Sequence, residues 1–220
     1  VVYDLTDRHS VYASYTSIFQ PQTVRDSNNQ ILDPEEGNSY EAGLKSEFND
    51  GRLNTTVAVF RINQDNLAES TGQPIIGGPA NSVAYRSVDG AETNGFELEA
   101  AGEILPDWQV QAGYTYRITE DPDGDELNTT SPEEMVRLST RYRLSGRFDG
   151  LTVGAGVAWQ NRIYAFVDRP GQSGQYKFVQ DSYTLVDLMA RYRFSPALAV
   201  TANVSNLTDE KYYNNLGFYN

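Results

Sequence analysis

The most constraining feature of this sequence is a long alternation of apolar and polar residues between Trp108 and Thr119. Every second residue there is apolar or aromatic: Trp108, Val110, Ala112, Tyr114, Tyr116 and Ile118. Side chains of a strand point alternately to its two faces, so the pattern predicts a strand with one apolar and one polar face. Its length matches the roughly 9–11 residues that a tilted strand needs to cross a bilayer.

The same pattern recurs along the chain. Further strands are expected over residues 10–19, 39–48, 52–63, 92–104, 132–146, 151–162, 181–194 and 198–204, with a strand end at 1–3. The apolar and polar faces of 52–63 cannot be assigned from its sequence. Short turns near Asp50, Pro106, Asp149 and Pro196 alternate with long connections, and the connections over 64–91 and 163–180 are expected to be loops. This alternation is typical of an outer-membrane barrel with short periplasmic turns and long extracellular loops, and not of a soluble sandwich.

Composition supports this fold class. Only 39% of the residues are hydrophobic and the mean hydropathy is −0.53, which is low for a large sealed core. A barrel tolerates this, because only alternate residues meet lipid. We therefore predict an all-β, antiparallel, up-and-down transmembrane β-barrel, of which this chain holds about nine or ten strands. An odd strand count, the start at Val1 without a signal peptide and the lack of a final apolar strand suggest a piece of a larger barrel.

Other function classes are disfavoured by charge and residue content. A net charge of −13 argues against nucleic acid as a partner. The chain has no Cys and a single histidine, His9, so thiolate sites, His-pair zinc sites and a Ser-His-Asp triad are not expected. The acidic run 121–126 lacks the ligand spacing of a calcium loop and is expected to be a solvated loop. We predict neither an enzyme nor a resident metal or cofactor.

Three patches resemble the barrel of TonB-dependent siderophore receptors. They run from Asn38 to Asn54, continuing through Ala58-Val59-Phe60; from Asp89 to Glu99, with its Gly-Phe-Glu-Leu-Glu strand start; and from Asn203 to Tyr213. Within the family, the sequence is most similar to ferric hydroxamate and pyoverdine-type receptors. The resemblance implies a 22-stranded barrel whose bore holds an N-terminal plug. Residues 1–220 would then be a C-terminal portion of this barrel, with the plug absent from the chain.

The resemblance also implies a function. Such a receptor lies in the bacterial outer membrane, among lipid and lipopolysaccharide, binds a ferric siderophore at its extracellular face, and imports it when the TonB energy-coupling complex acts on the plug. Three alternatives remain open: a passive porin-like channel, a TonB-dependent importer of a non-iron nutrient, and a surface protein that uses the barrel as an anchor.

Two groups of residues are candidates for this function. Aromatic rings and one arginine near strand ends suit a bulky amphipathic chelate: Arg162, Tyr164, Phe166, Tyr176, Tyr213, Phe218 and Tyr219. The alternative for aromatic residues is the interfacial girdle of any such barrel, which is favoured for Trp108, Trp159 and Phe194. Charged residues of the polar faces either contact ligand or plug, or, as we favour, pair across strands: Glu41, Lys45, Glu47, Glu97, Glu99, Glu103, Arg117, Arg137, Arg141, Arg143, Asp187, Arg191 and Arg193.

Overall fold

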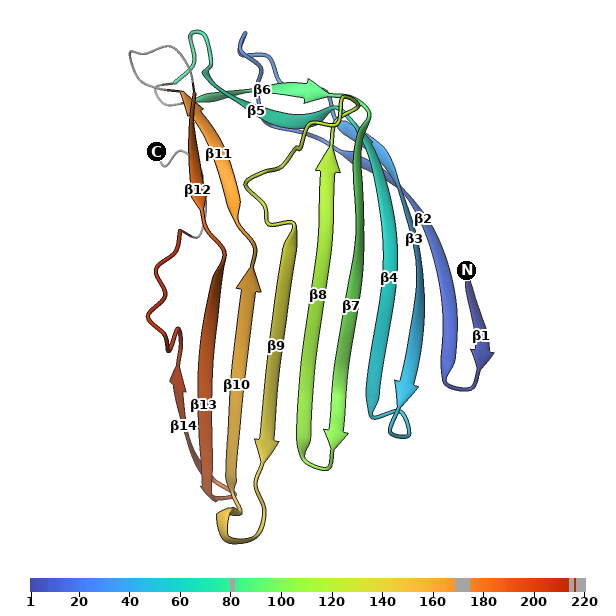
Figure 1. The fold of residues 1–220 in the computed structure, drawn as a ribbon, viewed down its shortest axis with the longest axis vertical. Helices are drawn as coiled ribbons and strands as arrows, with labels where there is room; N and C mark the ends of the chain where they lie inside the picture. The colour runs from blue at the N-terminus through green and yellow to red at the C-terminus, as the bar shows by residue number, and fades with distance from the viewer. Residues whose placement is uncertain (80–81, 169–174, 214–215, 217–220) are drawn as a thin grey trace.

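A computed structural model describes residues 1–79, 82–168, 175–213 and 216. One large antiparallel sheet dominates it, with the order β1-β2-β3-β4-β7-β8-β9-β10-β13-β14 (Figure 1). Its strands are β1 (Val2–Thr6), β2 (His9–Gln20), β3 (Glu35–Phe48), β4 (Leu53–Asp65), β7 (Ala91–Leu105), β8 (Trp108–Glu120), β9 (Glu134–Arg143), β10 (Leu151–Gln160), β13 (Tyr183–Ser195) and β14 (Leu198–Val204). The up-and-down arrangement and the expected strands are confirmed.

Two small hairpins correct the predicted loops. β5 (Leu67–Pro74) pairs with β6 (Val83–Val88), and β11 (Ile163–Asp168) pairs with β12 (Gln175–Gln180). Both lie at the end of the sheet that carries the long connections, with β5 and β6 crossing over that end (Figure 1). The prediction of loops over 64–91 and 163–180 is wrong, because their Gly and Pro residues interrupt short strands without preventing them.

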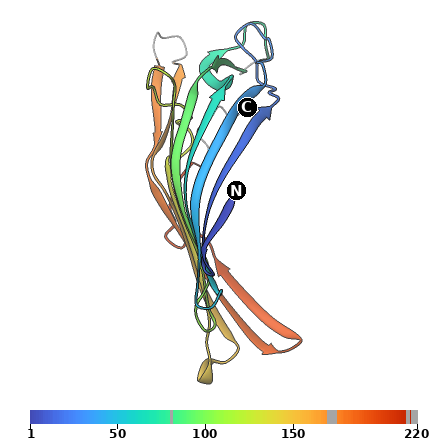
Figure 2. The same ribbon diagram turned by 90° about the vertical axis from the view of Figure 1, so that its right-hand side faces the viewer.

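The sheet is a single curved layer, seen in profile in Figure 2. No second layer covers its apolar face in the described part of the chain, and no large side chain there is fully buried. Val59 on β4 and Leu198 on β14 remain 58% and 56% exposed. A continuous apolar face that no other layer covers is expected of a sheet that contacts the hydrocarbon core of a membrane. Among the described residues, no helix has the length and apolar character needed to cross a membrane.

Strand register aligns the apolar residues into rows across the sheet. One row crosses seven strands: Val11, Leu44, Val57, Leu98, Tyr114, Val136 and Trp159. Because Val57 belongs to this row, its neighbours Thr56 and Ala58 lie on the polar face, and Phe60 follows them there. The register therefore assigns the faces of β4, which the sequence leaves open.

Aromatic residues mark both edges of the apolar band. Near the long connections the ring of Tyr15 lies 5.3 Å from that of Tyr40. Near the short turns Trp108 lies 5.8 Å from Tyr142, and Tyr192 lies 4.7 Å from Phe194. The eight-residue step along β8 from Trp108 to Tyr116 spans about 26 Å at about 3.3 Å per residue. Strands of outer-membrane barrels tilt by roughly 35–45°, so this step covers about 20 Å of their roughly 25 Å apolar band, as expected for an aromatic girdle.

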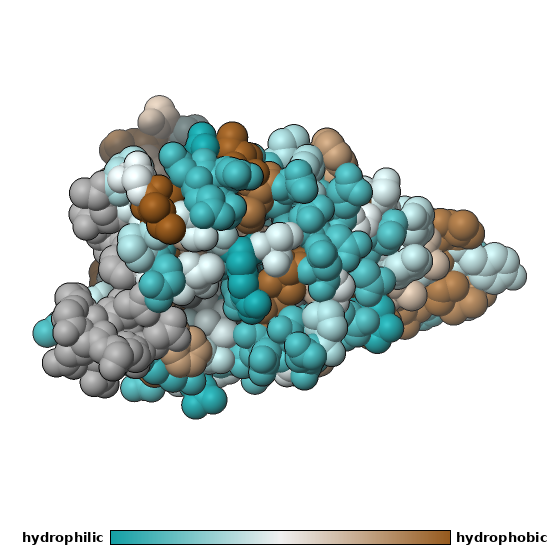
Figure 3. Space-filling view, turned by 90° about the horizontal axis from the view of Figure 1, so that it is seen from above, coloured by the Kyte–Doolittle hydropathy of each residue, from teal (hydrophilic) through white to brown (hydrophobic). Residues whose placement is uncertain are grey.

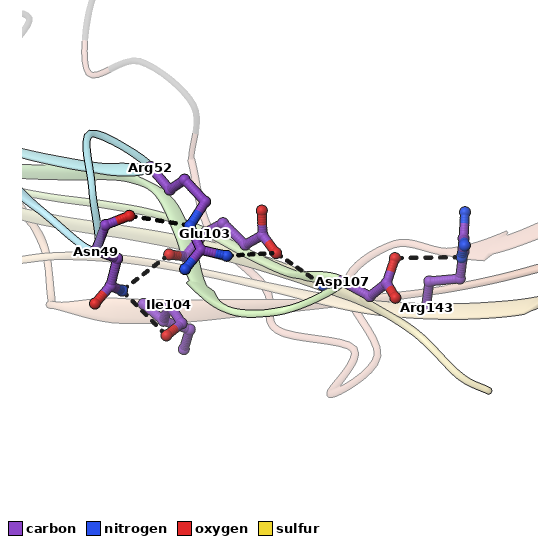
Figure 4. Close-up of polar contacts among 6 residues, drawn as sticks. All are labelled: Asn49, Arg52, Glu103, Ile104, Asp107 and Arg143. Carbon is purple, nitrogen blue, oxygen red and sulfur yellow. Dashed lines mark hydrogen bonds and ion pairs between the residues drawn. The ribbon is translucent and has the colours of Figure 1, made fainter.

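The short turns are tied to one another by polar contacts (Figure 4). Asn49 adopts a φ of 52° and donates from Nδ2 to the carbonyl oxygens of Glu103 and Ile104, both at 3.2 Å. Arg143 Nε lies 3.3 Å from Asp107 Oδ1 in the next turn. These contacts join the ends of the β3–β4, β7–β8 and β9–β10 connections, so the rim of the sheet is held from turn to turn.

Candidate functional site: the β11–β12 hairpin and its surroundings

The predicted ligand residues lie mostly on or beside the β11–β12 hairpin. Arg162 precedes β11, Tyr164 and Phe166 belong to β11, Tyr176 belongs to β12, and Tyr213 lies in the segment after β14. The remaining two predicted residues, Phe218 and Tyr219, lie outside the described residues. Seen from this end, the described surface is mostly hydrophilic with scattered hydrophobic residues (Figure 3).

One face of the hairpin holds two aromatic rings and a lysine. The rings of Tyr164 and Phe166 meet edge to face at 5.6 Å. Lys177, opposite Phe166 in the register, places its Nζ 3.5 Å from the centre of the Tyr164 ring and 5.7 Å from that of Phe166. A cation over an aromatic face is attracted by the ring quadrupole. The structure thus combines Tyr164 and Phe166 with Lys177, which sequence analysis missed although residues 175–180 alternate like a strand.

The opposite face of the hairpin carries a separate aromatic group. Tyr176 and Phe178 point there by strand alternation. The Phe178 ring lies 5.5 Å from Tyr213, whose backbone N–H donates to Gln180 Oε1 at 2.8 Å. The predicted residues therefore do not form one cluster, because the hairpin divides them between two faces.

Tyr164 joins the hairpin to the connection between β8 and β9. Its backbone N–H donates to Thr129 O at 2.8 Å, and Thr129 Oγ1 donates back to Tyr164 O at 2.8 Å. The Tyr164 hydroxyl also donates to Glu126 Oε2 at 3.2 Å. Three hydrogen bonds through one residue fix the position of β11 against this connection.

Two carboxyl groups in that connection influence each other. Burial raises the pKa of Glu133, and the charge and hydrogen bond of Glu126 raise it further, while the Arg162 guanidinium lowers it. Burial and Glu126 likewise raise the pKa of the Tyr164 hydroxyl. Within the described ranges, no group of three or more His, Asp or Glu side chains is placed to hold a metal ion. The surroundings therefore favour the protonated forms of Glu133 and Tyr164, with the Arg162 guanidinium close to both groups.

The acidic run 121–126 forms a turn. Asp121 Oδ1 accepts hydrogen bonds from the backbone N–H groups of Asp123 at 3.0 Å and Asp125 at 2.9 Å. Downstream, Leu127 is buried with Leu67 and Val88 of the β5–β6 hairpin. The connection is therefore held by a local turn at its start and by packing against the β5–β6 hairpin in its middle.

Below the connection, the polar face of the sheet is hollowed. A cavity of about 620 Å³ is bounded by Glu126 and Glu133 from the connection and by Glu41, Glu97 and Arg117 from the strands. Its lining is rich in hydrogen-bonding and charged groups. The cavity therefore lies between the β8–β9 connection and the polar side of the sheet, where it can accommodate a polar solute.

Charge pairing across strands is weaker than the sequence suggests. Glu41 lies opposite Ser14 and Phe60, and Arg137 lies opposite Gly113 and Ala158. Of the thirteen charged candidates, only Glu103 and Arg143 form ion pairs with described residues, to Arg52 and Asp107. The favoured interpretation of these residues as cross-strand pairs is therefore wrong for most of them.

Comparison with known proteins identifies the family. The model of the TonB dependent receptor-like β-barrel matches residues 1–207. The ferripyoverdine receptor of Pseudomonas aeruginosa is 46% identical over 99% of this chain and 27% of its own length. The ferrioxamine B receptor of Salmonella typhimurium is 32% identical over 91% of this chain and 28% of its own length.

Solved structures agree with this assignment. The crystal structure of the ferripyoverdine receptor of the outer membrane of Pseudomonas aeruginosa, bound to ferripyoverdine, matches with a TM-score of 0.84 and 46% identity, over 99% of this chain and 29% of that one. The chain thus spans between a quarter and a third of the length of these relatives. It belongs to the TonB-dependent receptors, as a segment of their outer-membrane β-barrel.

Proposed function

We propose that this chain is the C-terminal wall segment of an outer-membrane receptor that binds a ferric siderophore at its extracellular end and imports it with energy from the TonB complex. The observation that carries the proposal is the 46% identity, along nearly the whole chain, to a receptor named for ferripyoverdine. A plug outside residues 1–220 fills the bore in this proposal and receives the pull of TonB. The ferric ion is cargo of the siderophore, so no resident cofactor is involved.

The residues proposed to contact the ferric siderophore are those of the Tyr164 face of the hairpin. Tyr164, Phe166 and Lys177 offer two rings and an ammonium group, and Arg162 adds a second cation beside them. Rings stack on the flat parts of a chelate, and cations attract its anionic groups. Tyr176 and Tyr213, on the opposite face, are proposed as secondary contacts. Phe218 and Tyr219 remain proposed contacts from sequence alone.

Ferric siderophore titrations of the full-length receptor test the site. Tyr164→Ala combined with Lys177→Ala should weaken binding of ferripyoverdine about tenfold or more, measured by quenching of the receptor's tryptophan fluorescence. Phe148→Ala, at an exposed residue near the short turns, is the matched control and should bind normally. Equal binding by the double variant and the control would remove this hairpin face from the proposal.

Uptake assays distinguish TonB-dependent import of a ferric siderophore from the alternative functions. Radiolabelled iron should enter cells as the ferric siderophore only when the receptor and the TonB complex are both present. Uptake without TonB would indicate a passive channel. Binding of a different scarce nutrient, with no ferric siderophore bound, would indicate a non-iron importer, and no transport at all would leave the anchor function.

A further inference from the structure

Four arginines gather on the polar face of the sheet near the short turns. Arg141 and Arg143 on β9 and Arg191 and Arg193 on β13 line a hollow of about 350 Å³, in a chain whose net charge is −13. The only carboxylate among the described lining residues is that of Asp107, which pairs with Arg143 at 3.3 Å (Figure 4). The other three guanidinium groups form neither ion pairs nor side-chain hydrogen bonds with described residues. The hollow is therefore a site of unneutralised positive charge.

Strand β10 forms the floor of this hollow, and its residues there are small. Thr152 lies in register between Arg143 on one side and Arg191 on the other. Two residues farther along β10, Gly154 lies opposite Arg141. We call this feature, lined by the four arginines and floored by β10, the arginine trough.

The positions of Thr152 and Gly154 are two levels of the trough along β10, and Gly150 marks a third level at its lower end. Gly150, which precedes β10, accepts a hydrogen bond at its carbonyl oxygen from the backbone N–H of Arg193 at 2.9 Å. Arginines therefore occur at three successive levels along the floor, those of Gly154, Thr152 and Gly150. Levels two residues apart are separated by about 6.6 Å, because a strand rises about 3.3 Å per residue.

An extended polypeptide has the same repeat. Side chains at every second position of such a segment point the same way and recur about 6.6 Å apart. The planar fork of arginine binds carboxylates through paired, charge-assisted hydrogen bonds. From this correspondence, we propose that the arginine trough binds an extended acidic segment of the polypeptide that fills the bore of the same receptor, through carboxylates at alternate positions. The proposal rests on the function proposed above, in which the bore is filled.

A polypeptide suits the trough better than a small anion. The positive charge extends over three successive levels on the two strands that flank β10, farther than one small anion reaches. The ferripyoverdine receptor extends well beyond the 27% of its length that this chain covers, so such receptors have ample further polypeptide. Once the bore is filled, these arginines are no longer surrounded by water. Carboxylates of the bore-filling polypeptide would then neutralise their charge.

Site-directed cross-linking in the full-length receptor tests the proposal. The 220 residues contain no cysteine, so Thr152→Cys introduces the only thiol of this segment, which is labelled with a benzophenone maleimide and irradiated in outer-membrane vesicles. Mass spectrometry should identify a captured peptide from outside residues 1–220 with two carboxylates separated by one residue. When Arg191→Glu and Arg193→Glu are added, the cross-linking yield should fall about tenfold, because the new glutamates repel the carboxylates of the acidic segment.

A control and a rescue complete the test. Arg147→Glu reverses an exposed charge at the same end, outside the trough, and should leave the yield unchanged. Replacing the captured carboxylates by lysine should restore cross-linking to the doubly reversed receptor. Capture of a peptide without acidic residues, no capture, or capture that ferric siderophore abolishes would overturn the proposal. Ferric siderophore binding, measured in parallel, reports the proposed function independently: its absence alongside an acidic cross-link would refute import and leave the trough intact.

Discussion

At the scale of single residues, the two faces of a strand differ in what surrounds them. Leu138 on β9 is 39% exposed on the apolar face, between Ala112 and Val157. Thr115 on β8 lies on the polar face, opposite Glu97. Leu138→Arg should cost roughly 2–4 kcal/mol, the usual cost of a charge on the lipid face. Thr115→Arg should have little effect, because the new guanidinium meets a carboxylate.

The measurement for this pair is the free energy of unfolding of the full-length receptor in lipid vesicles, from urea titration. Equal losses at the two positions would contradict the assignment of the faces.

Gly102 is a residue whose backbone requires glycine. Its φ is 140°, next to the irregular pairing between Glu103 and Leu105, and an added Cβ would collide with the carbonyl oxygen of Arg52. Gly102→Ala should therefore destabilise the receptor by roughly 1–3 kcal/mol in the same titration. Gly113, where an added Cβ would meet no atom within 4 Å, is the control. If Gly113→Ala lowered the free energy of unfolding as much as Gly102→Ala, the collision of the added Cβ could not be the cause of the loss at Gly102.

At the scale of elements, the β11–β12 hairpin should respond to pH through Glu133. Its pKa is raised chiefly by burial, so the folded state favours the protonated form. The stabilisation is complete below the ordinary pKa of a glutamate, about 4.3, and is lost as pH rises through the raised value. We expect the backbone amides of β11 to be better protected from hydrogen exchange in mild acid than at neutral pH, after correction for intrinsic rates.

Two substitutions test whether Glu133 causes the pH dependence of hydrogen exchange in β11. Glu133→Gln should make the protection of β11 independent of pH, since an amide cannot ionise. Asp123→Asn, at an exposed position in the same connection, should retain the pH dependence. An unchanged pH profile in Glu133→Gln would assign the effect to another group.

The elements also differ in how well they could be predicted. The long strands were recognised because a period of two over ten or more residues requires no knowledge of the partner strand. The hairpins β5–β6 and β11–β12 were missed, because their strands are short and their position depends on contacts such as Tyr164 with Thr129, far apart in sequence. For the same reason, Tyr164 and Phe166 can be identified as candidates from the sequence, whereas Lys177 and Glu133 cannot.

At the scale of the whole molecule, the sheet is open at both sides. Among the described strands, β1 and β14 each pair with one neighbour, which leaves their outer N–H and C=O groups available to pair with another chain. The 220-residue chain produced alone in detergent should therefore self-associate, and light scattering should give masses well above 24.5 kDa. A monodisperse particle of that mass, after subtraction of bound detergent, would show that the edges are protected in some other way.

By itself, the sequence determined the long strands of the sheet, the apolar and polar faces of all of them except β4, and the membrane setting, because side-chain alternation and strand length are local properties. It also determined the family, through three patches of residues. Tertiary structure decided the faces of β4, the split of the aromatic residues over two faces of a hairpin, and the gathering of four arginines around β10. These depend on register, and register is set by which strands become neighbours in space.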